Sequence, residues 1–488
     1  MVAATTVDLT TLPKAFIDKI DYYEDLFWVT PETLKKVVTH FVDELNKGNS
    51  VKGGNIPMIP SWVMEYPDGS ETGEYLAIDL GGTNLRVVKV KLLGDHKFST
   101  EQNKYHIPAE LRTTRNKDEL FDFIAKCLDD FIQDQNPSGV PEGTVYPLGF
   151  TFSYPCLQSS IDAGVLKTWT KGFDIPGVEG HNVVPMLMEK VNARKVPVKV
   201  VALINDTSGT LVASRYTDAT TEMGVIFGTG VNGAYFDRVQ NIPKLQGKLY
   251  SDIKPTDPML INCEYGSFDN EHLVLPRTKF DERIDAESPR PGEQAFEKMT
   301  AGYYLGELLR MILCELYEEG LVFKDYKPDS EQIKLLHKPY HLDTSFLAMI
   351  EGDDDLIDLP EASALFSSQL FIDATLEERK LARMLCQFIG TRAARLSICG
   401  ISAVCKKMNH SKCHIAADGS VFAMYPHFPE RAAQGLADVF DFPALKEGEK
   451  EYPIHIVQAQ DGSGVGAAII AALSDARKAK GLSLGLKL

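Results

Sequence analysis

Leu76-Ala-Ile-Asp-Leu-Gly-Gly-Thr-Asn-Leu-Arg86 is the stretch that decides the fold. A short apolar run at 76–78 predicts a buried strand, and the alternating residues 85–93 predict a second strand after a tight turn. Glycines in such a turn let backbone N–H groups approach a phosphate, and Thr83 adds a hydroxyl donor. Asp79, at the end of the strand, suits a magnesium ion held through water. Taken alone, the motif fits a plain β-hairpin equally well.

A second copy of this pattern lies later in the chain. Residues 223–227 are apolar, Gly228-Thr229-Gly230 turns the chain, and residues 234–236 continue as a strand. Two such hairpins indicate a duplicated α/β unit. The run 228–233 also satisfies G-x-G-x-x-G, but the dinucleotide fingerprint must open a helix, and a strand follows here. A Rossmann domain is therefore excluded.

Further elements follow from apolar periodicity. Continuous apolar runs at 146–151 and 198–204 predict strands buried on both faces. Thr30 and Pro31 are typical of a helix start, and Gly48 predicts its end. Residues 118–133, 293–319, 376–407 and 465–478 each predict one helix. Strands alternating with helices indicate the α/β class.

Composition excludes several classes of protein. The 488 residues hold 51 Lys+Arg against 68 Asp+Glu, a net charge of −17, which argues against nucleic-acid binding. The eight cysteines are scattered and include no Cys-x-x-Cys pair, which argues against a disulfide scaffold and against a zinc site. Residues 1–11 lack a secretory signal, and the aliphatic stretch 465–473 is far shorter than the ~20 residues of a membrane helix. We therefore expect a cytoplasmic protein without membrane insertion.

Seven motifs, taken in order, resemble the signature of the hexokinase family, and most closely its fungal type with a single catalytic unit. The resemblance runs from about residue 34 to residue 473, and its motifs lie at 76–86, 148–155, 168–173, 204–207, 228–233, 261–268 and 294–298. It implies the two-lobed fold shared with actin and the Hsp70 ATPase domain. Each lobe would carry a ribonuclease-H-like sheet, with a sugar and ATP cleft between a small and a large lobe.

The resemblance also implies domain bounds. Residues 16–70 would form an N-terminal helical part of the large lobe, and residues 71–206 the small lobe. Residues 207–458 would form the rest of the large lobe, and residues 459–488 a C-terminal helix that returns to the small lobe.

By the resemblance, Asp206 is the catalytic base and Lys171 assists it. Asp206 stands just past a buried apolar strand, where burial can tune its pKa and hold its direction. An isolated Asn-Asp-Thr would otherwise be read as a turn or a helix cap. Ionised carboxylates only accept hydrogen bonds, so they suit sugar hydroxyls. The implied sugar ligands are Ser153, Tyr154, Thr170, Lys171, Asn205, Asp206, Asn232, Glu264 and Glu297.

The implied nucleotide contacts surround the Gly-Thr turns and two further Gly-centred turns near the C-terminus. They are Asp79, Leu80, Gly81, Gly82, Thr83, Asn84, Arg86, Lys104, Thr229, Gly230, Asp418, Gly419, Ser420 and Gly462. Position 460 is Gln, where many relatives carry an acidic residue, and this affects only a peripheral contact. No protein residue is expected to bind metal directly, since magnesium would be held by the ATP phosphates.

The leading hypothesis is an ATP-dependent hexokinase that phosphorylates the 6-hydroxyl of glucose, and of fructose and mannose, at the first step of glycolysis. The sugar would induce lobe closure. The alternatives are an actin- or chaperone-like ATP-binding switch and a sugar-sensing regulator without kinase activity. The sugar residues distinguish the first from a switch, and Asp206 argues against lost catalysis. A monomer–homodimer equilibrium is compatible with the resemblance.

Overall fold

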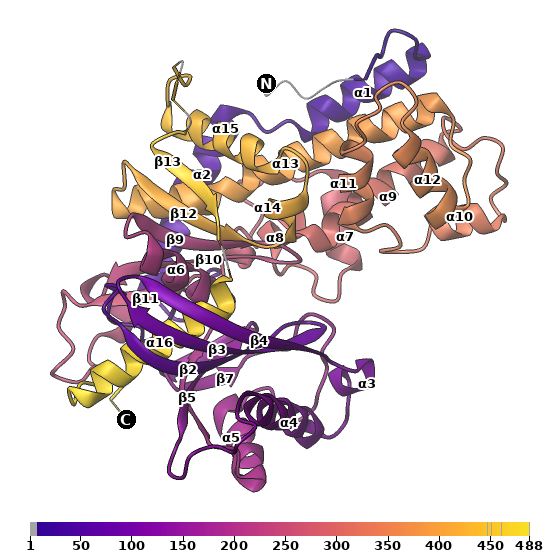
Figure 1. The fold of residues 1–488 in the computed structure, drawn as a ribbon. Coiled ribbons are helices and arrows are strands. Elements are labelled where there is room, and N and C mark those ends of the chain that lie inside the picture. Colours follow the sequence, from indigo (N-terminus) through magenta and orange to yellow (C-terminus); the bar gives the residue numbers. More distant parts are fainter. Residues whose placement is uncertain (1–6, 447, 450, 460, 488) are drawn as a thin grey trace.

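Two mixed β-sheets organise the molecule, one in each lobe (Figure 1). The computed structural model describes residues 7–446, 448–449, 451–459 and 461–487. The sheet of the smaller lobe has the order β4-β3-β2-β5-β8. Its strands are β2 (Thr72–Leu80), β3 (Asn84–Gly94), β4 (Lys97–His106), β5 (Tyr146–Phe152) and β8 (Val198–Ile204).

The sheet of the larger lobe repeats this topology. Its order is β1-β11-β10-β9-β12-β13, with β1 (Ile59–Pro60), β9 (Thr221–Phe227), β10 (Val231–Arg238), β11 (Pro258–Asn262), β12 (Cys413–Asp418) and β13 (Ile454–Gln458). In both sheets three antiparallel strands are followed by two parallel ones. The first Gly-Thr turn joins β2 to β3, and the second joins β9 to β10. The topology confirms the predicted duplication and the two-lobed α/β class.

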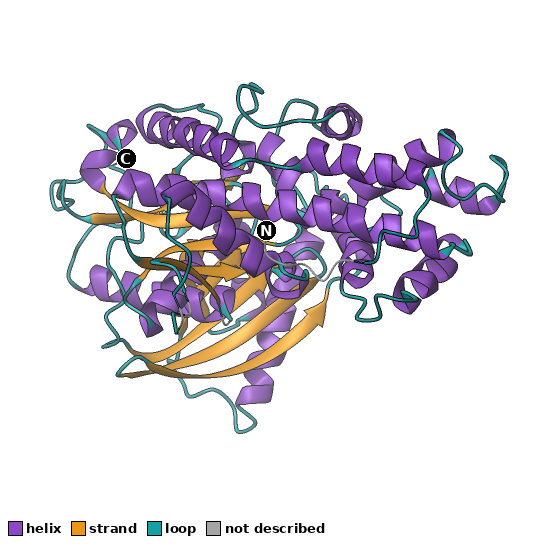
Figure 2. Cartoon of the chain, turned by 90° about the horizontal axis from the view of Figure 1, so that it is seen from above, coloured by secondary structure: helices purple, strands orange, loops and turns teal. Residues whose placement is uncertain are grey.

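Helices alone form one end of the larger lobe, as both views show (Figures 1 and 2). The helices of the larger lobe are α1 (Lys14–Phe27), α2 (Pro31–Ser50), α7 (Lys279–Glu287), α8 (Ala295–Thr300), α9 (Gly302–Glu318), α10 (Glu331–Leu336), α11 (Thr344–Glu351), α12 (Pro360–Leu370), α13 (Leu376–Met408), α14 (Ser420–Met424) and α15 (Phe428–Phe440). Of the helices described, α13 alone has the length and hydropathy of a membrane span. However, 89% of its apolar window is buried inside the protein, so this is weak evidence for a span.

The smaller lobe has its own hydrophobic core. Helices α4 (Lys117–Gln135) and α5 (Val183–Arg194) cover its sheet, with the short α3 (Ala109–Arg112) and the hairpin of β6 (Cys156–Ser160) and β7 (Ala163–Leu166) beside them. Phe121, Ile124 and Leu128 of α4 share this core with Phe150 of β5. The remaining core residues form a second cluster that extends through the larger lobe.

Two helices meet between the sheets. Helix α6 (Asp206–Thr217) contacts β9 and β10 of the larger lobe, whereas α16 (Gly462–Ala479) contacts β2, β5 and β8 of the smaller lobe. They approach so closely that a Cβ at Gly466 would lie 2.1 Å from the carbonyl oxygen of Gly209. Any side chain there would force the helices apart, so glycine is required.

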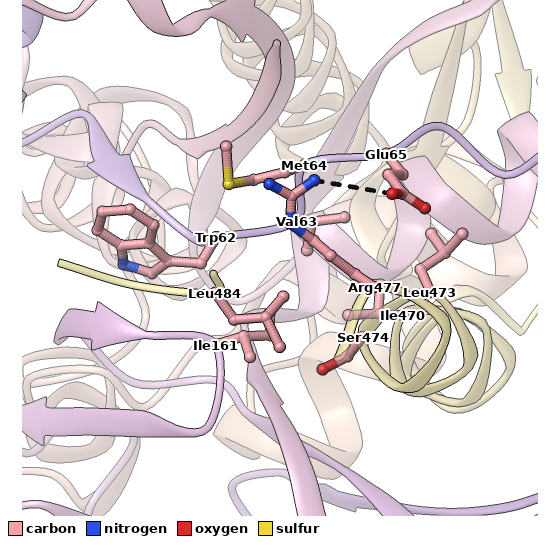
Figure 3. A pocket seen from close by; sticks show the side chains of 10 residues that line it. All are labelled: Trp62, Val63, Met64, Glu65, Ile161, Ile470, Leu473, Ser474, Arg477 and Leu484. Atoms are coloured by element: carbon pink, nitrogen blue, oxygen red, sulfur yellow. Dashed lines mark ion pairs between the residues drawn. The ribbon is translucent and has the colours of Figure 1, made fainter. Parts of the chain in front are cut away.

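The chain crosses between the lobes beside α16 (Figure 3). Residues 62–65 follow β1 of the larger sheet and precede β2 of the smaller one. A cavity of about 10 Å³, room for roughly one water molecule, lies between this link and Ile470, Leu473 and Arg477 of α16. Glu65 and Arg477 form an ion pair at 3.7 Å on its rim. The crossing is thus almost fully packed.

Two helix bounds differ from the sequence predictions. Gly48 does not end α2, which continues to Ser50; a Cβ at Gly48 would lie 2.2 Å from the Ile56 carbonyl oxygen, so the glycine serves packing. The predicted helix at 293–319 is two helices. Ala301 is extended (ψ 146°), and the Gly302 N–H donates to the Gly228 carbonyl at 2.8 Å. This break joins α9 to the second Gly-Thr turn.

Candidate active site

Asp206 stands where β8 gives way to α6, at the junction of the lobes. Asn205 caps the helix, since its Oδ1 accepts from the Thr207 N–H at 3.0 Å. The same N–H donates to Asp206 Oδ1 at 2.9 Å, and Asp206 Oδ2 lies 4.0 Å from Lys171 Nζ. The N-terminus of α6 and the Lys171 ammonium both bring positive charge close to this carboxylate. Its side chain keeps 24% of its surface exposed, so a ligand can reach it.

The large-lobe candidates converge on one polar cluster beside Asp206. Asn232 Nδ2 lies 3.3 Å from Asn205 Oδ1 and 3.4 Å from Glu264 Oε1. Asn262 links Asn232 to Glu264, because it accepts from Asn232 at 2.8 Å and donates to Glu264 at 2.8 Å. Glu297 Oε2 accepts from the Val231 N–H at 3.0 Å. Each carboxylate thus keeps acceptor capacity for a further donor.

Burial sets the charge of this cluster. It raises the pKa of Glu264 from its ordinary 4.5 to about 7; the Asn262 hydrogen bond opposes this rise, and the carboxylates of Asp206 and Glu297 add to it. Burial likewise raises the pKa of Glu297, against the Val231 N–H bond and the charge of Lys171. Perturbed carboxylates of this kind are typical of functional sites, where a donor-rich ligand compensates for the lost water.

The small lobe contributes Lys171, which lies on the loop after β7. Lys171 has a left-handed backbone (φ 56°), and its Nζ lies 5.5 Å from the centre of the Tyr154 ring. Ser153 directly follows β5 and is 7% exposed, while Thr170 accepts from the Phe173 N–H through its carbonyl at 3.1 Å. The loop is therefore turned so that the ammonium faces Asp206.

Tyr154 and Leu80 lie behind this surface. Tyr154 is 1% exposed, and its ring packs edge-on against Trp169 at 5.0 Å. Its hydroxyl donates to the Gly81 carbonyl at 3.2 Å. Leu80 is fully buried in the small-lobe core. The Tyr154 side chain therefore supports the first Gly-Thr turn through its hydroxyl, and the Leu80 side chain anchors the start of this turn in the core.

The first Gly-Thr turn lies beside the start of α16. The Gly81 N–H donates to the Asn84 carbonyl at 3.0 Å, and Asn84 Nδ2 donates to Thr83 Oγ1 at 2.8 Å. Gly82 faces the Lys171 loop, because a Cβ there would lie 3.5 Å from the Lys171 Cβ. Thr83 is exposed. The turn therefore lies against the Lys171 loop and leaves Thr83 exposed.

Arg86 joins this turn to the turn around Gly462, at the start of α16. It pairs with Asp79 at 3.1 Å and with Asp461 at 2.7 Å, and it donates to Ser463 Oγ at 2.5 Å. Ser463 in turn donates to Asp79 Oδ2 at 2.7 Å. These contacts hold Gly462 and the N-terminus of α16 beside the first Gly-Thr turn. A helix N-terminus favours anions.

The second Gly-Thr turn contacts the turn after β12. A Cβ at Gly228 would lie 3.5 Å from Gly419 Cα, and Gly419 has φ 109°, where a side chain would be strained. Burial raises the pKa of Asp418, whose Oδ1 accepts from the Gly419 N–H at 2.7 Å. Thr229 and Ser420 are both exposed. The turn that carries Thr229 and Gly230 therefore lies against the turn that carries Asp418, Gly419 and Ser420.

Lys104 lies on β4, an edge strand of the small-lobe sheet. It pairs in register with Arg86, so both side chains are on the same face of the sheet. Lys104 is exposed at this edge. Gln460 lies outside the described residues.

Sequence reasoning missed three residues that complete the site: Asn262, Asp461 and Ser463. Asn262 was within the quoted motif, and its position two residues before Glu264 could have indicated it. Asp461 and Ser463 flank a recognised glycine turn, but their partner Arg86 lies 375 residues from Asp461 in the sequence. A contact at that separation leaves no local signal.

Comparisons with known proteins agree with this geometry. Two family models, both described as hexokinase, match residues 19–216 and 222–473. Hexokinase-1 of Saccharomyces cerevisiae is 57% identical over 98% of this chain and 96% of the relative.

The chain belongs to the hexokinase family. The hexokinase of Kluyveromyces lactis is 56% identical over 98% of this chain and 96% of the relative. The solved structure of the Schistosoma mansoni hexokinase complexed with glucose has a TM-score of 0.82 and 32% identity, and covers 94% of this chain and 99% of that one. The protein is thus an ATP-dependent hexose kinase with the two-lobed hexokinase fold. The expected family, enzyme class and fold are confirmed.

Proposed function

We propose that this hexokinase transfers the γ-phosphoryl group of ATP to the 6-hydroxyl of D-glucose, and of fructose and mannose, with Asp206 as general base. The single observation that carries the assignment is the meeting of Asp206 with Lys171 at 4.0 Å beside the polar cluster. Asp206 Oδ2 takes the proton of the hydroxymethyl group as its oxygen attacks the γ-phosphorus. Lys171 would lie beside this carboxylate and balance charge near the transferred group.

The proposed sugar site uses groups from both lobes. Asn232, Glu264 and Glu297 would bind the ring hydroxyls from the large lobe, Ser153, Thr170 and Lys171 from the small lobe, and Asn205 from the end of β8, where the lobes meet. Tyr154 would support the first Gly-Thr turn beside them. Four charged or amide acceptors should bind most tightly a sugar that has every hydroxyl. An analogue lacking one hydroxyl leaves a buried acceptor unpaired and binds more weakly. A ligand bound by both lobes favours their closed arrangement.

The proposed ATP site follows the two Gly-Thr turns. Residues 79–84 and Thr229-Gly230 would bind the phosphates through backbone N–H and hydroxyl donors, and residues 418–420 and Gly462 would bind the adenosine side. Arg86 would hold the two turns together, and Lys104 would add positive charge near the polyphosphate. The anion is thus bound by local donors, which a protein of net charge −17 requires.

Magnesium is proposed as the partner of the ATP phosphates. The donor set fits an ion held through water: Asp79 Oδ2 already accepts from Ser463 and pairs with Arg86, which leaves Oδ1 as an acceptor without a partner among the described residues. One carboxylate oxygen suits a hydrated magnesium ion and is too few for a protein-built site. When bound, the ion would neutralise phosphate charge; Asp79 would orient its water.

Domain bounds and compartment complete the proposal. Residues 71–206 act as the small lobe that moves, with residues 459–488 attached to it, against residues 16–70 and 207–458 of the large lobe. Contacts of α16 with β2, β5 and β8 support this division. The enzyme would work in the cytoplasm, with a monomer–homodimer equilibrium.

The test is Asp206→Asn, which keeps the size of the side chain but cannot take the proton. We expect kcat to fall by about 10²- to 10⁴-fold, while glucose still binds in a calorimetric titration. Asp252→Asn is the control, since Asp252 lies on the surface loop after β10 and accepts from Ser483. Turnover within twofold of the parent enzyme would contradict the assignment.

A further inference from the structure

The two lobes also touch away from the polar cluster, at Arg290. Arg290 Nη2 donates to Thr168 Oγ1 and, at 3.3 Å, to the Trp169 carbonyl oxygen. Thr168 and Trp169 belong to the small lobe, on the loop that follows β7, whereas Arg290 follows α7 of the large lobe. The partners lie 122 residues apart. None of the motifs that indicated the family includes Arg290.

The large-lobe side of this contact is firmly held. The Arg290 carbonyl accepts from Lys298 Nζ at 2.8 Å, and Lys298, which is 5% exposed, pairs with Asp285 at 2.7 Å. Asp285 also accepts from the Gly292 N–H at 3.0 Å. Prolines at 289 and 291 further restrict the backbone on both sides of Arg290. Because Lys298 directly follows Glu297, one ion pair holds both Arg290 and a proposed sugar ligand.

The small-lobe side is equally fixed. Trp169 is 5% exposed and stacks on Phe173 with ring centres 5.3 Å apart. Its backbone N–H donates to Glu179 Oε1 at 2.7 Å, and its indole Nε1 donates to the Ile175 carbonyl at 3.0 Å. Thr170 and Lys171 follow immediately in the chain. The acceptors of Arg290 therefore lie directly before the two residues that the small lobe would bring to the sugar.

We propose that Arg290 is a positioning residue: it latches the lobes together and holds the Thr170-Lys171 loop over bound sugar. The inference rests on the proposed sugar site. The contact joins the two moving bodies, so it exists only when they meet, and its free energy adds to the closed arrangement alone. A guanidinium bonded to a hydroxyl and a carbonyl makes charge-assisted hydrogen bonds, which are stronger than neutral ones.

This role predicts where the loss should appear. Removing the latch lowers the population of the closed state, and the apparent sugar affinity falls with that population. Saturating sugar restores closure by mass action, so kcat should change little while KM for glucose rises. A purely structural role would instead lower the melting temperature of the sugar-free protein.

The experiment is a double-mutant cycle of Arg290→Ala and Thr168→Ala, read out by glucose titration calorimetry and steady-state kinetics. We expect Arg290→Ala to weaken glucose binding about 5- to 30-fold and Thr168→Ala about 2- to 5-fold, with kcat within threefold. The double variant should resemble Arg290→Ala, because Arg290 donates to Thr168. Arg290→Lys should recover part of the affinity through one donor, and Thr168→Ser should retain it.

The matched control is Arg283→Ala. Arg283 is exposed on α7 and pairs with Glu287 of the same helix at 2.8 Å, so it carries the same charge without reaching the other lobe. Glucose affinities that are equal in Arg290→Ala and Arg283→Ala would overturn the latch, as would fully additive effects in the cycle. Glu297→Gln separates the two proposals. If it weakens glucose binding and Arg290→Ala does not, only the latch fails; if neither does, the sugar site fails too.

Discussion

Replacing Glu264 by Gln should stabilise the sugar-free enzyme, and by more at high pH than at low pH. Glu264 is partly buried in the polar cluster, and its pKa is raised to about 7. In the unfolded chain the pKa is near 4.5. Between these values the folded state binds the extra proton, so the contribution of Glu264 to stability falls as the pH rises from about 4.5 to about 7. Gln carries no charge and removes this penalty.

The magnitude follows from the shift. A difference of about 2.5 pKa units is worth roughly 3 kcal/mol once the pH exceeds both values, and only about 1 kcal/mol near pH 5. Gln can still accept from Asn262 Nδ2, so the hydrogen bond at 2.8 Å is kept. A chain of 488 residues unfolds with an entropy of roughly 1 kcal/mol/K. We therefore expect a gain in melting temperature of about 3 °C near pH 8 and about 1 °C near pH 5.

The assay is a thermal melt of the parent enzyme, Glu264→Gln and Glu293→Gln at about pH 5 and about pH 8. Glu293 is an exposed residue, so its variant controls for the loss of a carboxylate as such. Glucose should erase part of the difference at high pH, because its hydroxyls would stabilise the ionised Glu264 that Gln replaces. A melting temperature that changes equally at both pH values would refute the reasoning, since the charge of Glu264 would then not be the cause.

Three further outcomes can be checked directly. Glu297→Gln should weaken glucose binding by roughly 1–3 kcal/mol and leave ATP binding unchanged, by calorimetry; a loss confined to ATP would contradict the sugar assignment. Gly466→Ala should destabilise the protein by about 1–3 kcal/mol or more in urea melts, since its Cβ would lie 2.1 Å from Gly209 O, whereas Ala468→Gly controls for helix propensity. Glucose should reduce the radius of gyration in X-ray scattering, and an unchanged profile would mean that the lobes do not close on the sugar.

Local patterns predicted the strands and turns that carry the chemistry. The apolar run at 198–204 matches β8 residue for residue, and both Gly-Thr turns join the strands expected on either side. These features are encoded locally, because a strand buried on both faces needs a continuous apolar run, and a tight turn needs glycine. For residues 205–207 the sequence left a turn or a helix cap as the alternative to a catalytic site; the structure shows that Asn205 caps α6, a helix that none of the predicted ranges covered.

Tertiary contacts decided what these patterns could not. Periodicity continues through Ala301, yet the helix breaks there because Gly302 binds the second Gly-Thr turn. Gly48 looked like a helix end, but it is a point of close packing against Ile56. In both cases a partner distant in sequence overrides local propensity.

The sequence by itself determined the family, the duplicated α/β unit and the types of residue proposed to meet the sugar and ATP, since these reside in short motifs whose chemistry is local. Only the tertiary structure decided how the motifs meet: Lys171 opposite Asp206, Arg86 between Asp79 and Asp461, and Arg290 against Thr168. Each pair joins segments that lie on different lobes or on different turns. Their approach is set by the packing of whole sheets and helices, chiefly α6 on α16, and no local stretch of sequence records that geometry.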